Sequence, residues 1–355
     1  MAEAVFGWDV GGAHLKACRL ERGAVADVAL WACPLWQGLD RLEHAFALAR
    51  ERWPDLPGSA HAATMTGELA DLFADREDGV KRIAHCTVAA LGEAVAFFAG
   101  DGWAGADEVA RDWPRIASAN WLASARLAAR RVGTGVWVDI GSTTTDLVAL
   151  AGAAVACAGR SDAERLAAGE LVYHGVVRTP LCALAPRIAF RGTTYGVMNE
   201  WFATSADVYR LTGELDPADD LQPAADGAAK DADATRRRLA RMIGLDARDA
   251  EPSDWLAFAR AWRAAQLATI ADALARVVRS QAIAADAPLV AAGCGAFLVA
   301  ELAGASGRPW VAYADARAGI VPLARRDPAL ARRAGVCAPC VAVAALFEEE
   351  RRACG

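Results

Sequence analysis

Two aspartates in matching contexts are the residues best suited to chemistry. Asp9 and Asp139 each end an apolar run, and each is followed by one apolar residue and a glycine. Residues 6–12, Phe-Gly-Trp-Asp-Val-Gly-Gly, align without gaps on residues 136–142, Val-Trp-Val-Asp-Ile-Gly-Ser. A glycine turn after a strand lets backbone N–H groups converge on an anion. The sequence therefore predicts an internal duplication with two anion-binding turns.

The side chains beside these turns favour phosphate as the anion. The candidate phosphate-binding residues supply glycine backbone, one cation and several hydroxyl donors: Gly11, Gly12 and Lys16 near the first turn, and Gly141, Ser142, Thr143 and Thr144 in the second. Carboxylates beside phosphates require a divalent cation between them, so Asp9 and Asp139 predict Mg²⁺ bound with a di- or triphosphate. Asp also caps turns that bind no ligand.

A third glycine element lies near residue 290. An apolar run at 289–292 leads into Gly293 and Gly295, a tight turn whose backbone could lie against a nucleotide base or another planar group. This pattern is common in α/β proteins and is a weak signal by itself.

The surrounding pattern predicts an α/β protein. Residues 4–9, 15–20 and 25–31 form an antiparallel meander of three strands, and the pattern returns at 136–140, 147–150 and 153–158. Short strands at 59–65 and 94–98 alternate with expected helices at 39–53, 80–91 and 118–131, which is typical of α/β architecture. A long helix at 255–284 and a last helix at 341–352 complete the expected elements.

A chain of 355 residues exceeds one ordinary core, so we expect two lobes. The first spans 1–132 and is completed by the C-terminal helix 336–355; the second spans 133–335, with an exposed excursion around 207–254. The Pro-, Asp- and Gly-rich stretch 215–235 is expected to be a loop, and Arg236, Arg237 and Arg238 to be a solvated helix face.

The charge and the composition of the chain predict where the protein is located in the cell and which classes of partner it binds. A net charge of −6 argues against binding to a nucleic-acid backbone. The N-terminus lacks a signal-peptide pattern and no apolar stretch is long enough to span a bilayer, so we expect a cytoplasmic protein with small-molecule substrates, without a membrane and as a possible homodimer. The nine cysteines are expected to be reduced and mostly buried; Cys337 and Cys340 form a lone CxxC that could be redox-active or half of a zinc site.

In this order and spacing, the three glycine elements resemble the two phosphate motifs and the adenosine motif of the actin, hexokinase and Hsp70 superfamily. The resemblance implies two duplicated ribonuclease-H-like lobes with a central cleft. Residues 139–146, Asp-Ile-Gly-Ser-Thr-Thr-Thr-Asp, look like the hydantoinase A and oxoprolinase branch, in which a Gly occupies the position of Ser142.

A closer resemblance runs through four motifs: Thr-Met-Thr-Gly-Glu-Leu-Ala-Asp at 64–71, Ser-Ala-Asn-Trp-Leu-Ala at 118–123, Arg-Thr-Pro-Leu at 178–181 and Phe-Ala-Thr-Ser-Ala-Asp-Val-Tyr at 202–209. They are similar to the family of tetrahydromethanopterin-linked one-carbon transfer proteins, which includes a methanofuran-biosynthesis synthase. The resemblance implies a transferase that joins an aminomethylfuran-methyl diphosphate to the phenol of a tyramine-like acceptor and releases pyrophosphate.

That chemistry requires a base for the phenol proton. The candidates are Asp139, Asp146 and Glu68, although Glu68 could equally be a first-turn helix carboxylate. Asn120 and Trp121 could line an aromatic substrate pocket, although Trp is also a frequent packing residue. Two other functions stay open: an ATP-dependent small-molecule kinase or hydantoinase-type enzyme, and a non-catalytic nucleotide-responsive regulator.

Overall fold

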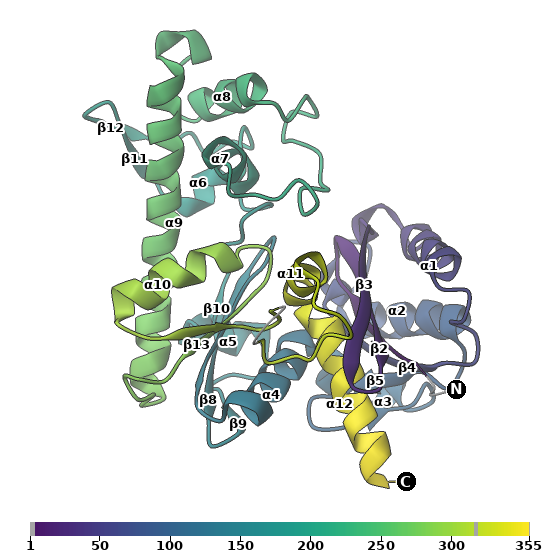
Figure 1. Cartoon of the computed structure of the whole chain (residues 1–355). Coiled ribbons are helices and arrows are strands. Elements are labelled where there is room, and N and C mark those ends of the chain that lie inside the picture. Colours follow the sequence, from purple (N-terminus) through teal and green to yellow (C-terminus); the bar gives the residue numbers. More distant parts are fainter. Residues whose placement is uncertain (1–3, 316–318, 355) are drawn as a thin grey trace. The chain divides into compact units, whose positions relative to one another are not determined.

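The chain forms two compact units, each with its own sheet (Figure 1). The computed structural model describes residues 4–315 and 319–354. The first unit comprises Met1–Thr134, Leu150–Val155 and Val311–Gly355, and the second Gly135–Ala149 and Ala156–Trp310. Residues 1–3, with which the expected first lobe begins, lie outside the described residues.

The first unit is built on a six-stranded sheet in the order β3-β2-β1-β4-β5-β6. Its strands are β1 (Val5–Val10), β2 (His14–Glu21), β3 (Ala24–Ala32), β4 (Ala60–Met65), β5 (Ala96–Phe98) and β6 (Trp103–Ala104). Its helices are α1 (Asp40–Arg52), α2 (Arg76–Leu91), α3 (Val109–Ile116), α4 (Asn120–Val132), α11 (Pro328–Val336) and α12 (Ala338–Cys354), with 3₁₀ turns η1 (Leu35–Gln37) and η2 (Gly67–Leu69). The antiparallel meander predicted from the sequence is confirmed, because β1 pairs with β2 and β2 with β3.

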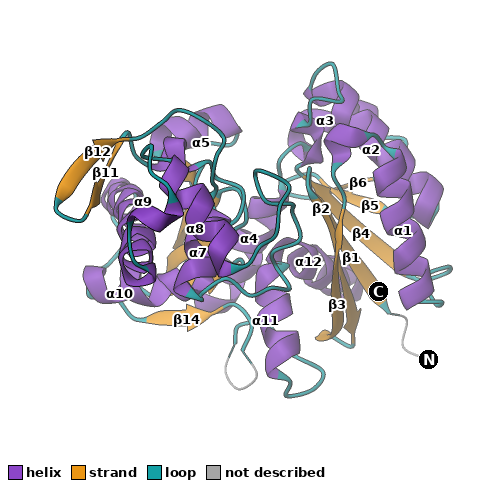
Figure 2. Cartoon of the chain, turned by 90° about the horizontal axis from the view of Figure 1, so that it is seen from above, coloured by secondary structure: helices purple, strands orange, loops and turns teal. Residues whose placement is uncertain are grey.

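The sheet of the first unit lies between α12 on one face and α1 and α2 on the other (Figure 2). Phe6 and Trp8 point toward α1, where the rings of Trp8 and Phe46 lie 5.3 Å apart. Gly7 points the opposite way, and a Cβ there would lie 1.9 Å from the carbonyl oxygen of Cys340 in α12. Only glycine therefore lets α12 pack this closely on β1.

The sheet of the second unit has the order β10-β8-β7-β13-β14, with β9 paired to β8; the ends of β8, β9 and β14 at residues 150–151, 154–155 and 311–312 are assigned to the first unit. Its strands are β7 (Gly135–Ile140), β8 (Thr145–Ala151), β9 (Ala154–Ala156), β10 (Leu171–Val172), β13 (Leu289–Ala292) and β14 (Trp310–Ala312), and β11 (Arg187–Phe190) and β12 (Thr193–Gly196) form a separate hairpin that the sequence analysis did not predict. Its helices are α5 (Asp162–Ala168), α6 (Leu181–Leu184), α7 (Ser205–Thr212), α8 (Ala232–Arg241), α9 (Pro252–Ser280) and α10 (Val299–Ser306), with 3₁₀ turns η3 (Ala247–Asp249) and η4 (Ala296–Leu298).

The internal duplication is visible in the two sheets. Strand β1 lies between antiparallel β2 and parallel β4, and β7 lies between antiparallel β8 and parallel β13. Asp9 and Asp139 therefore occupy the same place near the carboxyl end of a central strand. A short bend follows each strand, at residues 12–13 and 142–143, so the glycines of each motif lie at the carboxyl end of β1 or β7.

The second unit ends at Trp310, whereas the second lobe was expected to extend to residue 335. Residues 311–335, assigned to the second lobe from the sequence, belong to the first unit. The reason is long-range pairing: the N–H of Val25 in β3 bonds to the carbonyl of Pro322, the N–H of Ala324 bonds back to Val25, and α11 packs on β3.

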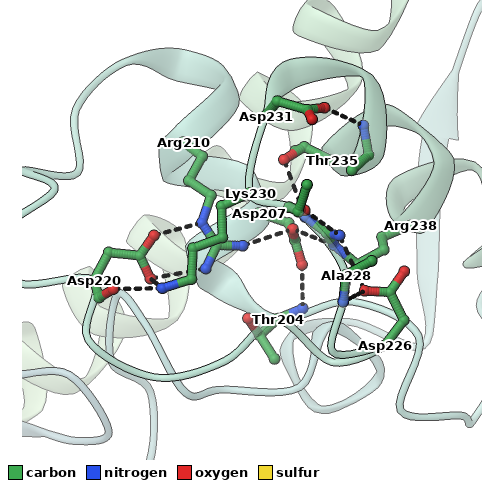
Figure 3. A network of polar contacts seen from close by, with 12 residues as sticks. Thr204, Asp207, Arg210, Asp220, Asp226, Ala228, Lys230, Asp231, Thr235 and Arg238 are labelled. Atoms are coloured by element: carbon green, nitrogen blue, oxygen red, sulfur yellow. Dashed lines mark hydrogen bonds and ion pairs between the residues drawn. The ribbon is translucent and has the colours of Figure 1, made fainter. Parts of the chain in front are cut away.

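The stretch around 207–254 contains a buried polar network instead of a purely exposed excursion (Figure 3). Asp207 in α7 and Arg238 in α8 are both fully buried and form an ion pair of 2.7 Å. Arg210 donates to Asp207 at 3.0 Å and makes a two-pronged contact with Asp220 at 2.7 and 2.8 Å. The loop between the helices is thereby tied to α7.

The prediction of a solvated face for Arg236, Arg237 and Arg238 is wrong for Arg238. In α8 its side chain shares the inward face with Ala234 and Thr235, while Arg237 is exposed. The local charge run carries no sign of the distant Asp207 that makes burial of this guanidinium possible.

No single helix in the described part of the chain is long and apolar enough to cross a membrane. One bent pair, α11 with α12, passes a test of length and composition with an angle of 91° between its halves. Helix α12 packs on β1, β2, β4 and α4 of the first unit, which accounts for its apolar residues.

Candidate functional site

The two glycine turns have the same backbone geometry. In the first turn (residues 11–14) the N–H of Gly11 donates to the carbonyl of His14 at 3.0 Å; in the second turn (residues 141–144) the N–H of Gly141 donates to the carbonyl of Thr144 at 2.8 Å. A side chain at Gly12 would enter open space, with no atom within 4 Å in the described structure. The first turn thus leaves room beside its backbone.

Asp9 lies behind the first turn as a buried carboxylate, 2% exposed. Lys16, its cross-strand partner on β2, places its ammonium 3.5 Å away, and the amide of Asn120 donates at 3.5 Å. Burial raises the pKa of Asp9, and Lys16 and Asn120 oppose this shift without cancelling it. Thr64, level with Asp9 on β4, is also buried, and its hydroxyl has no hydrogen-bond partner among the described residues.

Glu68 is a second buried carboxylate of the first unit, held in η2 just after β4. Ser118 donates its hydroxyl to Glu68 at 2.6 Å, and the guanidinium of Arg76 lies 3.9 Å from the same oxygen. Gly79 in α2 permits this packing, because a Cβ there would lie 2.6 Å from the carbonyl of Glu68. Ser118 adopts a φ of 50°, a costly conformation for a residue with a side chain.

Asn120 and Trp121, which were expected to line a substrate pocket, lie in different surroundings in the structure. Asn120 begins α4, and its amide group reaches Asp9. Trp121 is 4% exposed, so its indole belongs to the core of the first unit and is no open wall for a substrate ring. Consecutive residues of an α-helix point in different directions, so Asn120 is partly exposed while Trp121 is buried.

The second turn carries two neighbouring hydroxyl groups, and its backbone is closely packed against the segment after β10. Ser142 and Thr143 hydroxyls lie 3.4 Å apart, and a Cβ at Gly175 would lie 2.3 Å from the backbone nitrogen of Thr143. Thr145 donates to the carbonyl of His174 at 2.7 Å. The segment after β10 is therefore pressed against the turn and fixes its conformation.

Asp139 lies at the end of β7, against the third glycine element. A Cβ at Gly293 would lie 2.4 Å from a carboxylate oxygen of Asp139, and Gly293 has a φ of 84°. Gly295 donates its N–H to the carbonyl of Ile140 at 2.7 Å, and a Cβ there would clash with the Ile140 side chain. Both glycines are required by this contact with β7, whatever else the turn binds.

Asp146, a candidate base, is engaged in an ion pair. Arg165, 1% exposed, donates to Asp146 at 2.7 Å and to the carbonyl of Glu170 at 3.2 Å. This contact ties β8 to α5. Asp139 in β7 precedes the second turn, and Asp146 in β8 follows it.

Arg178 is a residue to which the sequence analysis assigned no role, although its motif was singled out. Its guanidinium donates to the hydroxyl of Thr143 at 3.4 Å, and its backbone N–H donates to Ser142 at 2.8 Å. The signal available in the sequence was the cation in Arg-Thr-Pro-Leu, but its approach to the second turn depends on tertiary contacts.

Asp139 and Asp9 are the two carboxylates expected to bind Mg²⁺. Among the described residues no group of three or more His, Cys, Asp or Glu side chains could enclose a metal. Mg²⁺ keeps several waters and binds through one or two carboxylates and substrate phosphates, so Asp139 beside a hydroxyl-rich turn fits that mode. Asp9 fits less well as a ligand, because Lys16 already neutralises it.

The CxxC pair is buried in the first unit. Cys337 and Cys340 are at most 1% exposed, and the thiol of Cys340 donates to the carbonyl of Cys337 at 3.1 Å. Burial raises the pKa of Cys340 well above its usual value, which opposes thiolate chemistry. These cysteines are packing residues at the start of α12.

Comparison with known proteins gives relatives for most of the chain. The sequence model of the hydantoinase/oxoprolinase family matches residues 59–319. The chain is 30% identical over 257 residues to the (4-{4-[2-(gamma-L-glutamylamino)ethyl]phenoxymethyl}furan-2-yl)methanamine synthase of Methanocaldococcus jannaschii, covering 72% of this chain and 76% of the relative. It is 32% identical over 111 residues to the enzyme of the same name from Methanococcus vannielii, covering 31% of this chain and 50% of the relative.

Among solved structures, the nucleotide-free acetone carboxylase is similar with a TM-score of 0.51 at 10% identity, over 84% of this chain and 66% of that one. Such a likeness shows the fold alone, and the fold is the expected α/β type with a duplicated strand pattern in its two sheets. The match over residues 59–319 shows that the chain belongs to the hydantoinase/oxoprolinase family.

Proposed function

We propose that this protein is a transferase of furan-cofactor biosynthesis that forms an aryl-alkyl ether. The relatives' printed name describes a phenoxymethyl-furan product, in which a phenol oxygen is joined to the methylene of a furan that also bears an aminomethyl group. The observation that supports the proposal most is the second turn, where Ser142, Thr143 and Arg178 gather donors beside Asp139. Such a site suits a phosphorylated leaving group.

The proposed reaction balances with a diphosphate ester as donor. The bond between the furan methylene and the diphosphate oxygen breaks, and its electron pair leaves with pyrophosphate. The phenol oxygen of a tyramine or glutamyl-tyramine acceptor forms the new bond to that methylene, and the phenol proton passes to a base. No oxidant, reductant or phosphoryl transfer is required.

The residues of the second unit supply donors where negative charge grows. The contacts among the hydroxyls of Ser142 and Thr143 and the guanidinium of Arg178 support the proposal that these groups bind oxygens of the leaving diphosphate. Such contacts strengthen as the C–O bond breaks. Mg²⁺, when bound with Asp139, would add charge neutralisation of the diphosphate. Asp139 and, in the first unit, Glu68 are the candidate proton acceptors.

The experiment is a comparison of two substrate sets with purified protein and Mg²⁺. A 5-(aminomethyl)furan-3-ylmethyl diphosphate with tyramine should release pyrophosphate and yield the ether, detected by mass spectrometry, and omission of tyramine should remove most of that release. Absence of ether from any tyramine-like acceptor would contradict the proposal.

The family match supports one alternative, an ATP-dependent kinase or hydantoinase-type enzyme. In the same assay, ATP alone or with an acceptor should then give ADP and phosphate or a phosphorylated product. Turnover of ATP without use of the furan diphosphate would favour this alternative.

A further inference from the structure

The segment after β10 encloses the second turn through its backbone. The N–H of Val176 donates to the carbonyl of Gly141 at 3.0 Å, and those of Val177 and Arg178 both donate to the carbonyl of Ser142, at 3.0 and 2.8 Å. Three consecutive residues are thus bonded to two consecutive residues of the turn. These hydrogen bonds fix the backbone of Arg178 beside the second turn, next to Thr143.

The side chain of Arg178 continues this contact. Its guanidinium belongs to a partly buried side chain and donates to the hydroxyl of Thr143 at 3.4 Å. Burial lowers the pKa of Arg178, but an arginine remains charged in proteins under ordinary conditions. A partly desolvated guanidinium beside hydroxyls and glycine backbone has the donors and the charge that phosphate oxygens need.

A buried relay supports this segment from behind. The side-chain amide of Gln266 in α9 donates to the carbonyl of Gly175 at 2.9 Å and accepts from the hydroxyl of Tyr209 in α7 at the same distance. The N–H of Gly175 in turn donates to the hydroxyl of Thr179 at 2.8 Å. Gln266 and Tyr209 are fully buried, so the relay can bind no solvent or ligand directly.

Helix α7 is itself fixed by the polar network of Figure 3. One oxygen of Asp207 accepts from Arg238 of α8 and from Arg210 of α7, and the other accepts from the N–H of Thr204, the N-cap residue of α7. The N–H of Ser205 donates to Thr179, next to Arg178. The motifs at 178–181 and 202–209 therefore act together, one presenting a cation and the other fixing its place.

We propose that Arg178 binds a terminal phosphate of the substrate at the second turn, as the cation of this site. The inference rests on the proposed function, since it names the residue that holds the leaving diphosphate. It gives the second unit its own phosphate-binding cation. The cation predicted from the sequence, Lys16, belongs to the first unit and is paired there with Asp9.

The test is direct binding of inorganic pyrophosphate with Mg²⁺, measured by isothermal titration calorimetry. Arg178→Gln should weaken binding about 10- to 100-fold, the range expected for a charge-assisted hydrogen bond. Arg178→Lys should recover part of that loss, because it keeps the charge and loses the planar fork. The matched control is Arg237→Gln, an exposed arginine of α8 in the same unit, which should bind as the wild type does.

A second measurement uses the unmodified protein, in case Arg178→Gln fails to fold. Phenylglyoxal labelling followed by mass spectrometry should show Arg178 protected by pyrophosphate and Arg237 labelled at the same rate with and without it. If the wild type binds pyrophosphate and a folded Arg178→Gln binds it equally well, the assignment of Arg178 is overturned. The same follows if pyrophosphate does not slow the labelling of Arg178. Neither result contradicts the proposed diphosphate chemistry. No binding of pyrophosphate by the wild type overturns both this assignment and the diphosphate chemistry.

Discussion

At the scale of single residues, Asp139 is the carboxylate on which the proposed chemistry depends most. It is the second-last residue of β7, two residues before Gly141, and its place is set by pairing with Ala292 of β13 and by close contact with Gly293. A neutral amide of the same shape keeps the packing but neither acts as a base nor offers a negative charge to a divalent cation.

We expect Asp139→Asn to reduce turnover by at least about 10³-fold, as for loss of a group that acts in the transition state. The thermal unfolding midpoint should stay close to that of the wild type. Pyrophosphate release measures the first and circular dichroism the second. The control Glu68→Gln separates the two candidate bases, and near-normal activity of Asp139→Asn would remove Asp139 from the mechanism.

Asp9 predicts a pH-dependent effect on stability. Because burial raises its pKa in the folded protein above the ordinary 3.8, ionisation of Asp9 opposes folding once the pH rises above that value. The free energy of unfolding of Asp9→Asn, relative to wild type, should therefore increase as the pH rises from about 4 through the raised pKa and then level off. Urea titrations at several pH values measure this difference.

The control for Asp9 is Asp101→Asn. The hydrogen bond from Arg115 lowers the pKa of Asp101, whose side chain is 83% exposed, so any trend with pH should have the opposite sign and be small. A flat pH dependence for Asp9→Asn would show that Lys16 and Asn120 compensate the burial fully.

At the scale of elements, the contact between the second turn and the segment after β10 decides the geometry of the site. A Cβ at Gly175 would lie 2.3 Å from the nitrogen of Thr143 and 2.4 Å from the carbonyl carbon of Ser142. Both are backbone atoms, which cannot move aside as the end of a flexible side chain can.

Gly175→Ala should therefore lower the free energy of unfolding by about 1–3 kcal/mol, as overpacking does, and weaken pyrophosphate binding as well. Chemical denaturation and calorimetry measure the two effects. Gly196→Ala is the matched control, because a Cβ on that residue of β12 meets nothing within 4 Å. Equal behaviour of the two variants would mean that the turn can shift at little cost.

The ion pair between α7 and α8 gives a second prediction for elements. Asp207→Ala leaves the guanidinium of Arg238 buried without its main partner, so the free energy of unfolding should fall by about 3–5 kcal/mol. Asp233→Ala, which removes an ion pair to Arg236 from a side chain 79% exposed, should cost at most about 1 kcal/mol. Denaturant midpoints compare the pair, and similar losses for both would exclude a dominant contribution from the buried contact.

At the scale of the whole molecule, the first unit is assembled from distant parts of the chain. Helix α12 covers β1, and its residues Val341, Ala342, Val343 and Ala344 are fully buried. Without α12 that face of the sheet would be exposed to water.

A chain that ends at Val336 should therefore fail to fold in its first unit, although most of the sheet lies within its first 104 residues. Near-ultraviolet circular dichroism and limited proteolysis measure the loss. Ending the chain at Arg352 instead keeps the buried part of α12 and should leave folding intact. A cooperative native-like spectrum for the shorter chain would contradict the role assigned to α12.

The amino-acid sequence by itself determined the features that depend on local order. The apolar runs, the glycines after them and the repeated Asp9 and Asp139 are local patterns, so the central strands β1 and β7, the duplication and the second turn could be predicted, whereas the short strands β6, β10 and β14 and the β11–β12 hairpin could not. Helix limits were close as well: 39–53 was expected where α1 spans Asp40–Arg52.

Only the tertiary structure decided which distant groups meet. The partner of Arg238, the ion pair of Asp146 with Arg165, the burial of Trp121 and the approach of Arg178 to Thr143 all join residues many positions apart. The same holds for residues 311–335, whose pairing with β3 places them in the first unit. Local sequence patterns reflect the periodicity of a helix or strand, whereas burial and charge pairing depend on the surfaces that folding brings together.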